Sequence, residues 1–219
     1  MINTFLSKSL KNPLFEVSDG ENRPYGGAQQ WFSKNYLRKC GCGVIACANI
    51  LAQKEIATPE KREVDMADYM KIANRLKSFY LPIIPGQGIN GWVMSLGINL
   101  YFLIHRLPYK AFWGVSAKKM DARIERMLSE DTPVCFSIGP NFPNLFGKKM
   151  VRLYSREGDK YVSNSEINGH YVSVTGMDDT WYEISTWGRK MYVKREEFRE
   201  YVKKHSCSLF SNVLVVRHK

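Results

Sequence analysis

The sequence predicts an α+β fold in which helices dominate about residues 25–130 and strands dominate about residues 131–219. Alanine and aliphatic residues recur at helical spacing in the first part, whereas the second part consists of short β-branched and aromatic segments separated by turn residues. Such segregation is typical of α+β proteins, and it leaves a cleft where the two halves meet. Because 219 residues can bury one sizeable core, we expect a single domain over residues 1–219.

An irregular arm and two helices are predicted in the first 80 residues. The arm ends in the turn-forming run Arg23–Gly27, which contains a proline and two adjacent glycines. Residues 43–54 (GVIACANILAQK) carry alanine and aliphatic side chains at helical spacing and predict a mostly buried helix. A second helix is predicted from about residue 65 to about residue 79, because residues 58–60 (TPE) provide a start signal.

The middle of the chain is less regular. Residues 82–91 (PIIPGQGING) are rich in proline and glycine and predict a loop. Residues 92–103 fit either a helix or a strand, and we favour a helix that ends before a short strand. A surface helix is predicted over about residues 118–129, since its apolar residues fall on one face.

After a turn at residues 130–133, the pattern changes to strands. Each segment is short, β-branched or aromatic, and bounded by turn residues, which predicts an antiparallel sheet or open barrel. One helix is expected to interrupt these strands at about residues 195–203. The predicted strand segments are PVCFSIG, MVRLYS, HYVSVTGM, TWYEIST, KMYVK and SLFSNVLVV.

Composition and charge exclude several classes of partner. The formal net charge of +11 attracts polyanions at low salt, but the basic residues are scattered and no nucleic-acid reading motif is present, so we expect no specific nucleic-acid partner. The longest apolar stretch, residues 92–107, is too short and too polar to span a membrane. The N-terminal residues lack the pattern of a secretory signal, and five cysteines are an odd number, so a cytoplasmic location with reduced thiols is expected.

A cysteine flanked by glycines is the first candidate functional residue. Cys42 lies between Gly41 and Gly43, immediately before the predicted helix. The two glycines allow a tight turn and leave the approach of a substrate open, so they are expected to form a wall of the site. At a helix N-terminus, unpaired amide hydrogens and the helix dipole stabilise a thiolate. The pattern predicts that Cys42 is a nucleophile.

A thiolate nucleophile needs a base, and His170 is the candidate. It follows Asn168 and Gly169 and opens an alternating strand, so its ring can project from the strand end toward the cleft. A paired cysteine and histidine form a thiolate and an imidazolium, which later protonates the leaving group. Fifteen residues further on, Ser185 ends a neighbouring predicted strand and is the candidate to orient the histidine ring.

The order of these residues resembles that of the papain-like cysteine peptidases. In those enzymes an asparagine precedes Ser-Trp-Gly, and here Ser185 precedes Thr-Trp-Gly. The segments GGAQQWF, GCGVIACANIL and NGHYVSVTGMDD are similar, more narrowly, to bacterial papain-like proteins related to the leader peptidases that process bacteriocin precursors, the family 39-like peptidases. The resemblance covers roughly residues 25–51 and 133–195, and it implies a papain-like fold with the active site between the two halves.

The resemblance also assigns roles to individual positions. It implies that Cys42 is the nucleophile, that His170 is the base, and that Trp187 shields the hydrogen bond of the histidine from water. A glutamine upstream of the nucleophile donates to the oxyanion in this family, and Gln29 or Gln30 matches it, with Gln29 preferred.

The third catalytic position departs from the family pattern. An asparagine or aspartate is expected there, and the hydroxyl of Ser185 is shorter and carries no charge. Asp178 and Asp179 are possible substitutes, although they fall in the turn after the strand that His170 opens.

The other cysteines leave alternatives open. Cys40 could compete with Cys42 as the nucleophile, whereas Cys47 lies within the helix and is expected in the core. These three cysteines together with His170 could instead bind zinc, but their spacing does not match paired-cysteine zinc sites. We therefore expect neither a metal nor a cofactor.

The resemblance implies hydrolysis of peptide or isopeptide bonds through a thioester acyl-enzyme, with a peptide or protein as substrate. Two alternatives remain open. Because Ser185 replaces the usual orienting residue, the fold could serve as a binding or regulatory module with little turnover. The same residues could also transfer the acyl group to an amine, as transglutaminases do. No feature of the sequence indicates an oligomeric state.

Overall fold

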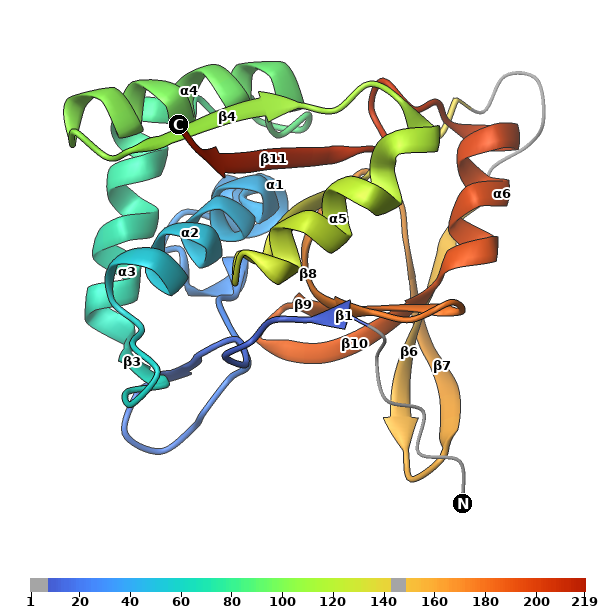
Figure 1. The fold of residues 1–219 in the computed structure, drawn as a ribbon, viewed down its shortest axis with the longest axis horizontal. Coiled ribbons are helices and arrows are strands. Elements are labelled where there is room, and N and C mark those ends of the chain that lie inside the picture. Colours follow the sequence, from blue (N-terminus) through green and yellow to red (C-terminus); the bar gives the residue numbers. More distant parts are fainter. Residues whose placement is uncertain (1–7, 143–148) are drawn as a thin grey trace.

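The computed structural model describes residues 8–142 and 149–219 of the chain. Within these residues, helices pack around a nine-stranded sheet in which every strand pairing is antiparallel (Figure 1). The predicted α+β class is confirmed. The helices are α1 (Asn35–Cys40), α2 (Cys42–Glu55), α3 (Met66–Arg75), α4 (Gly91–Ile104), α5 (Met120–Ser129) and α6 (Arg195–His205).

The large sheet joins strands from the whole length of the chain. Its strand order is β4-β11-β5-β8-β9-β10-β6-β7, with β1 paired to β8 beside that path. A separate small sheet pairs β2 and β3 in parallel. The strands are β1 (Lys8–Ser9), β2 (Glu16–Ser18), β3 (Glu63–Asp65), β4 (Tyr109–Trp113), β5 (Val134–Ile138), β6 (Val151–Glu157), β7 (Lys160–Ile167), β8 (His170–Met177), β9 (Trp181–Thr186), β10 (Arg189–Lys194) and β11 (Val213–His218).

Some elements differ from the sequence prediction. The N-terminal arm is not irregular throughout, because β1 and β2 lie in it and β1 pairs with the central strand β8. Strand β7 was not predicted from the sequence. Most of its side chains are polar and exposed, so it lacks the alternation of apolar and polar residues that marks a half-buried strand. The helix predicted to run to about residue 79 ends as α3 at Arg75 and continues as a π-helical turn over Leu76–Tyr80.

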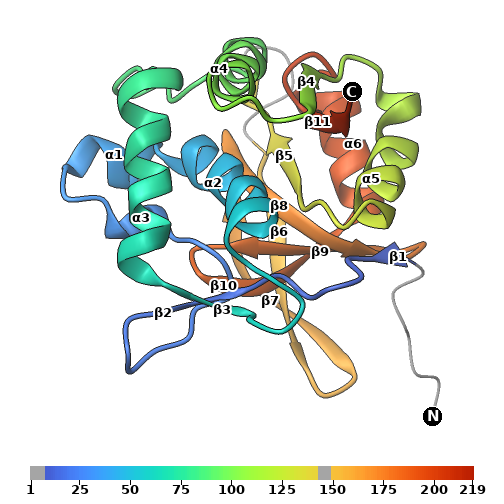
Figure 2. The same ribbon diagram turned by 60° about the vertical axis from the view of Figure 1, so that its left-hand side comes forward.

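Helix α2 lies at the centre of the molecule and fixes the position of the site. It packs against β8 and β5 on one side and against α3 on the other (Figures 1 and 2). Its residues from Cys42 to Gln53 are all buried, as expected for a helix that is apolar all round. Val44 and Cys47 of α2 and Val174 of β8 are fully buried in one hydrophobic core, so the helical and strand halves share that core.

The ambiguous segment after residue 91 is helical and forms α4, which packs beside β4 at the edge of the large sheet. In the described ranges, 8–142 and 149–219, none of the helices combines the length and the apolar character needed to cross a bilayer.

Candidate active site

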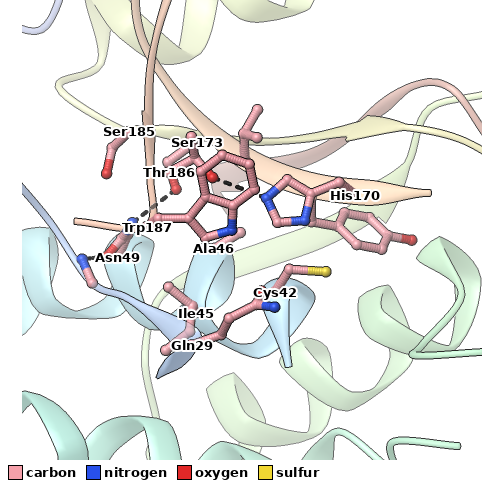
Figure 3. Close-up of a pocket in the computed structure, with 13 residues that line it drawn as sticks. Gln29, Cys42, Ile45, Ala46, Asn49, His170, Ser173, Ser185, Thr186 and Trp187 are labelled. Carbon is pink, nitrogen blue, oxygen red and sulfur yellow. Dashed lines mark hydrogen bonds between the residues drawn. The ribbon is translucent and has the colours of Figure 1, made fainter. Parts of the chain in front are cut away.

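The two halves of the fold meet at a small pocket that contains the predicted nucleophile and base. Cys42 and Gln29 enter it from the helical side, whereas His170, Thr186 and Trp187 enter it from β8, β9 and the turn after β9 (Figure 3). The cavity measures only about 10 Å³, which is room for roughly one water molecule. In this conformation, therefore, the space between these side chains is too small for a substrate group.

Cys42 is the first residue of α2, so it lies at the helix N-terminus as expected, although the helix begins one residue earlier than predicted. Gly41 caps the helix, and a Cβ atom there would lie 2.5 Å from the carbonyl oxygen of Leu37 and 2.8 Å from the ring of Phe32. Cys42 itself is only 9% exposed. Burial raises the pKa of its thiol to about 11, although backbone hydrogen bonds at Tyr171 and Gly43 act in the opposite direction.

His170 is the first residue of β8 and is also only 9% exposed. Its Nε2 atom lies 2.9 Å from the hydroxyl Oγ1 of Thr186. When Nε2 carries the proton, it donates to Thr186 and leaves a lone pair on Nδ1. The edge of the ring that bears Nδ1 faces Cys42 (Figure 3). Burial lowers the pKa of His170 to about 4, so the ring is neutral at pH 7.

The hydrogen-bond partner of His170 is thus Thr186 and not Ser185, which corrects the sequence expectation by one residue. Adjacent residues on a strand point to opposite sides, so both cannot face the ring. The Ser185 hydroxyl donates to the carbonyl oxygen of Tyr25 at 2.7 Å and points away from the imidazole (Figure 3). Ser185 therefore ties the loop before the first helix to β9.

The two aspartates considered as substitutes are far from the histidine. Asp178 follows the last residue of β8, whereas His170 is the first. A strand rises about 3.3 Å per residue, which separates the two positions by roughly 25 Å. The Asp178 carboxylate accepts hydrogen bonds from the backbone of Thr180 and Trp181 and shapes the turn to β9. Asp179 adjoins it in this turn and is exposed.

Trp187 covers the histidine from a tight hairpin turn. Trp187 and Gly188 connect β9 to β10, and their φ angles are 51° and 70°. A two-residue hairpin with two positive φ angles is the type I′ arrangement, which a side chain larger than asparagine rarely adopts. The turn brings the indole to within 5.2 Å of the His170 ring, measured between ring centroids, at an interplanar angle of 32°. This position suits the shielding role that the resemblance implies.

Of the two candidate glutamines, Gln29 lines the pocket and Gln30 is exposed. The Gln29 side chain is 7% exposed, and its Nε2 donates to the carbonyl oxygen of Arg38 at 2.6 Å. An amide nitrogen carries two hydrogens, so a second one is left for a developing oxyanion. The sequence preference for Gln29 therefore agrees with its location.

The structure does not place Gly41 and Gly43 in the wall of the pocket, where the sequence predicts them. Neither Gly41 nor Gly43 lines the pocket. A Cβ atom on Gly43 would lie 2.8 Å from Ile89 and 2.7 Å from Met94, so both glycines serve close packing around the start of α2.

Sequence reasoning missed a buried polar network beneath the pocket. Asn49 of α2 is 1% exposed and accepts hydrogen bonds from the Gly27 backbone N–H at 3.0 Å and from the Tyr69 hydroxyl at 2.8 Å. Its amide donates to the Ser173 hydroxyl at 2.9 Å. A Cβ on Gly27 would lie 1.9 Å from the Tyr69 hydroxyl oxygen. The network thereby anchors the loop that carries Gln29. An asparagine within an apolar helix was the only signal in the sequence.

The remaining cysteines are all free thiols. Cys47 is buried against Cys135 in the core, and Cys40 is half-buried at the end of α1. Among residues 8–142 and 149–219, there is no group of three or more histidine, cysteine, aspartate or glutamate side chains placed to hold a metal ion.

The charge state of the pair gives a testable pH dependence. Because the pKa of Cys42 is raised to about 11, alkylation of Cys42 by iodoacetamide in the ligand-free protein is expected to rise about tenfold per pH unit from pH 7 to pH 10. Peptide mapping by mass spectrometry measures the alkylation rate of Cys42 separately from that of the other cysteines. A flat, fast rate across neutral pH would contradict the neutral pair, because it would require a thiolate already formed.

Comparison with known proteins identifies the fold. No protein-family model matches the sequence, and no curated protein matches it significantly. Among solved structures, the chain is similar to that of a candidate C39-like peptidase from Bacillus anthracis, with a TM-score of 0.53 and 20% sequence identity. The match covers 97% of this chain and 98% of the other. The fold of this protein is therefore that of a C39-like peptidase.

Proposed function

We propose that the protein is a cysteine hydrolase that cleaves peptide or isopeptide bonds through a thioester on Cys42. The observation that carries this proposal is that Cys42 and His170 line the same pocket, with the Nε2 atom of His170 hydrogen-bonded to Thr186. Gln29 and Trp187 line the same pocket, which supports the oxyanion and shielding roles.

The proposed reaction begins with a neutral pair. The Cys42 thiol loses its proton to Nδ1 of His170 while the sulfur attacks the substrate carbonyl carbon. The resulting oxyanion accepts hydrogen bonds from the Gln29 amide and the Cys42 backbone N–H. The imidazolium then protonates the departing amine and leaves an acyl-thioester. Water adds to this thioester with His170 as base, and the acid product and the free thiol are released.

Proton transfer is disfavoured while both groups are buried, because burial raises the pKa of Cys42 and lowers that of His170. Turnover therefore requires the pocket to open or to admit a polar substrate. A groove of about 530 Å³ adjoins the pocket and shares Tyr171 with it. Ile89 and Gly91 line this groove, so a peptide lying there would pass beside the start of α2.

Trapping of the acyl-enzyme tests this proposal. The protein is incubated with a diverse peptide mixture, quenched in acid and mapped by mass spectrometry. An acyl adduct on Cys42, together with new peptide termini in the mixture, is the expected result. The Cys42→Ala protein is the control. Equal cleavage by both proteins would overturn the assignment of the nucleophile.

A second candidate function is a binding module with little turnover. It is favoured by the uncharged partner of His170 and by the small volume of the pocket. Saturable peptide binding without new peptide termini would support it.

Acyl transfer to an amine uses the same residues as hydrolysis. Formation of an amide product when an amine is added distinguishes acyl transfer from hydrolysis.

The roles of Thr186 and Ser185 are expected to separate in variants. Thr186→Val removes the hydroxyl that meets His170 and should lower kcat about tenfold or more, with little change in KM. Ser185→Ala removes the bond to Tyr25 and should mainly lower stability, by about 1 kcal/mol. Steady-state kinetics and urea unfolding of both proteins measure these effects. A larger loss of kcat in Ser185→Ala than in Thr186→Val would reverse the assignment.

A further inference from the structure

Helix α4 exposes a row of large apolar side chains on its outer face. Leu96 and Leu103 are 70% and 68% exposed, although leucine is among the residue types most often buried. No residue between Gly91 and Ile104 carries a charge. The exposed apolar residues of this helix are Trp92, Val93, Leu96, Leu100, Leu103 and Ile104.

These six side chains, which we call the α4 apolar face, lie on one side of the helix. At about 100° per residue, they fall within an arc of roughly 120°. The opposite side packs on the core through residues such as Met94, Ile98 and Phe102. Since a helix that is apolar all round is normally buried, the outer side of α4 is suited to contact with a second apolar phase.

Aromatic neighbours enlarge this surface at its margins. Phe79, which is 76% exposed, lies on the turn that packs against α4. At the start of the helix, the Trp92 ring meets Phe210 at 6.0 Å between centroids. The apolar surface therefore extends beyond α4 itself.

Basic groups lie beside the C-terminal end of the same helix. Arg106 follows α4 almost directly and is exposed. On the adjoining strands β4 and β11, Lys110 lies directly opposite Arg217 in the strand register, and both residues are exposed. Lys219 is held nearby through its backbone bond to Pro108. The whole chain carries a formal charge of +11. An apolar strip next to positive charge is complementary to an anionic lipid bilayer, which is apolar in its interior and negatively charged at its surface.

We propose that the α4 apolar face docks the protein on the surface of an anionic lipid membrane. The helix would lie flat in the interface, with its leucines among the upper acyl chains and with Arg106, Lys110 and Arg217 near the lipid phosphates. A helix of this kind lies on the bilayer and does not span it. A second copy of the chain is a poorer occupant, because two molecules of charge +11 repel each other.

This docking does not depend on catalysis, but it has a consequence for it. Gly91, the first residue of α4, lines the groove that adjoins the candidate active site, and Trp92 follows it directly. Docking through α4 would therefore bring the groove close to the lipid boundary.

Vesicle sedimentation tests the proposal on the intact protein. Binding to mixed phosphatidylcholine–phosphatidylglycerol vesicles is compared with binding to pure phosphatidylcholine vesicles. The variant Leu96→Glu/Leu103→Glu places two charges on the α4 apolar face at positions that are already solvated. The control Val115→Glu/Val162→Glu makes the same change of charge at two exposed valines outside α4. Circular dichroism checks that each protein is folded.

The expected result is binding to the anionic vesicles that weakens about tenfold or more in the α4 variant and much less in the control. Binding should also decrease with salt. Failure of the parent to bind would overturn the proposal, as would equal loss in variant and control, which would indicate charge attraction alone. A dimer seen by sedimentation velocity, abolished by the α4 substitutions and without vesicle binding, would instead assign this face to self-association.

Discussion

The His170→Ala substitution is expected to lower kcat/KM at pH 7 by about a thousandfold, the largest loss of activity that we predict apart from removal of Cys42. The reason is the buried state of the nucleophile. Because the pKa of Cys42 is raised to about 11, almost no thiolate exists at neutral pH unless a neighbouring base accepts the proton. His170 lines the pocket beside Cys42, and its Nε2 is already engaged by Thr186.

Initial rates on a peptide that the parent protein cleaves measure this effect. His218→Ala is the matched control, because His218 is exposed at the end of β11. Its rate should equal that of the parent. Partial rescue of His170→Ala by added imidazole would support a direct role in proton transfer. Activity of His170→Ala within a factor of about three of the parent would remove His170 from the mechanism.

The positions of Cys42 and His170 could be predicted because each depends on a local pattern. A glycine before an apolar helical run indicates a helix N-terminus, and a glycine before an alternating segment indicates the start of a strand. Both residues do begin their elements, α2 and β8. The antiparallel sheet and most of its strands followed from the same reasoning.

The orienting partner of His170 could not be predicted in the same way. Ser185 and Thr186 are both small hydroxyl residues at the end of one strand, and only the phase of that strand decides which one faces the ring. That phase depends on the pairing of β9 with β8 and β10, including an irregularity between Val174 and Gly176. Pairing between distant segments is not encoded locally, so the error of one residue has a physical origin.

The shifted pKa values and the polar network also depend on tertiary packing. The pKa of His170 is lowered by burial alone, and the depth of burial follows from how Trp187 and α2 close around it. Likewise, Asn49 meets its three partners only when segments from both halves of the chain come together. The sequence marks it merely as one polar residue in an apolar helix.

The Asn49→Ala substitution is expected to lower the free energy of unfolding by about 2–4 kcal/mol and to lower kcat as well. Without the amide, the Gly27 N–H and the Ser173 hydroxyl remain buried and lose their partner, at about 1–3 kcal/mol for each group. The Tyr69 hydroxyl keeps its bond to the carbonyl oxygen of Ile45, so it contributes less to the loss. Urea unfolding followed by fluorescence gives the change in free energy.

Kinetics separate this positioning role from a general loss of stability. Loosening of Gly27 should displace Gln29, which acts on the transition state, so kcat should decrease more than KM increases even at temperatures where the variant is fully folded. Asn74→Ala is the matched control, because Asn74 is exposed on α3 and its loss should change stability by less than about 0.5 kcal/mol. If Asn49→Ala were as stable as that control, the hydrogen bonds of Asn49 would not anchor the loop. If it were unstable but kept the kcat of the parent when folded, the anchor would serve the fold and not the oxyanion site.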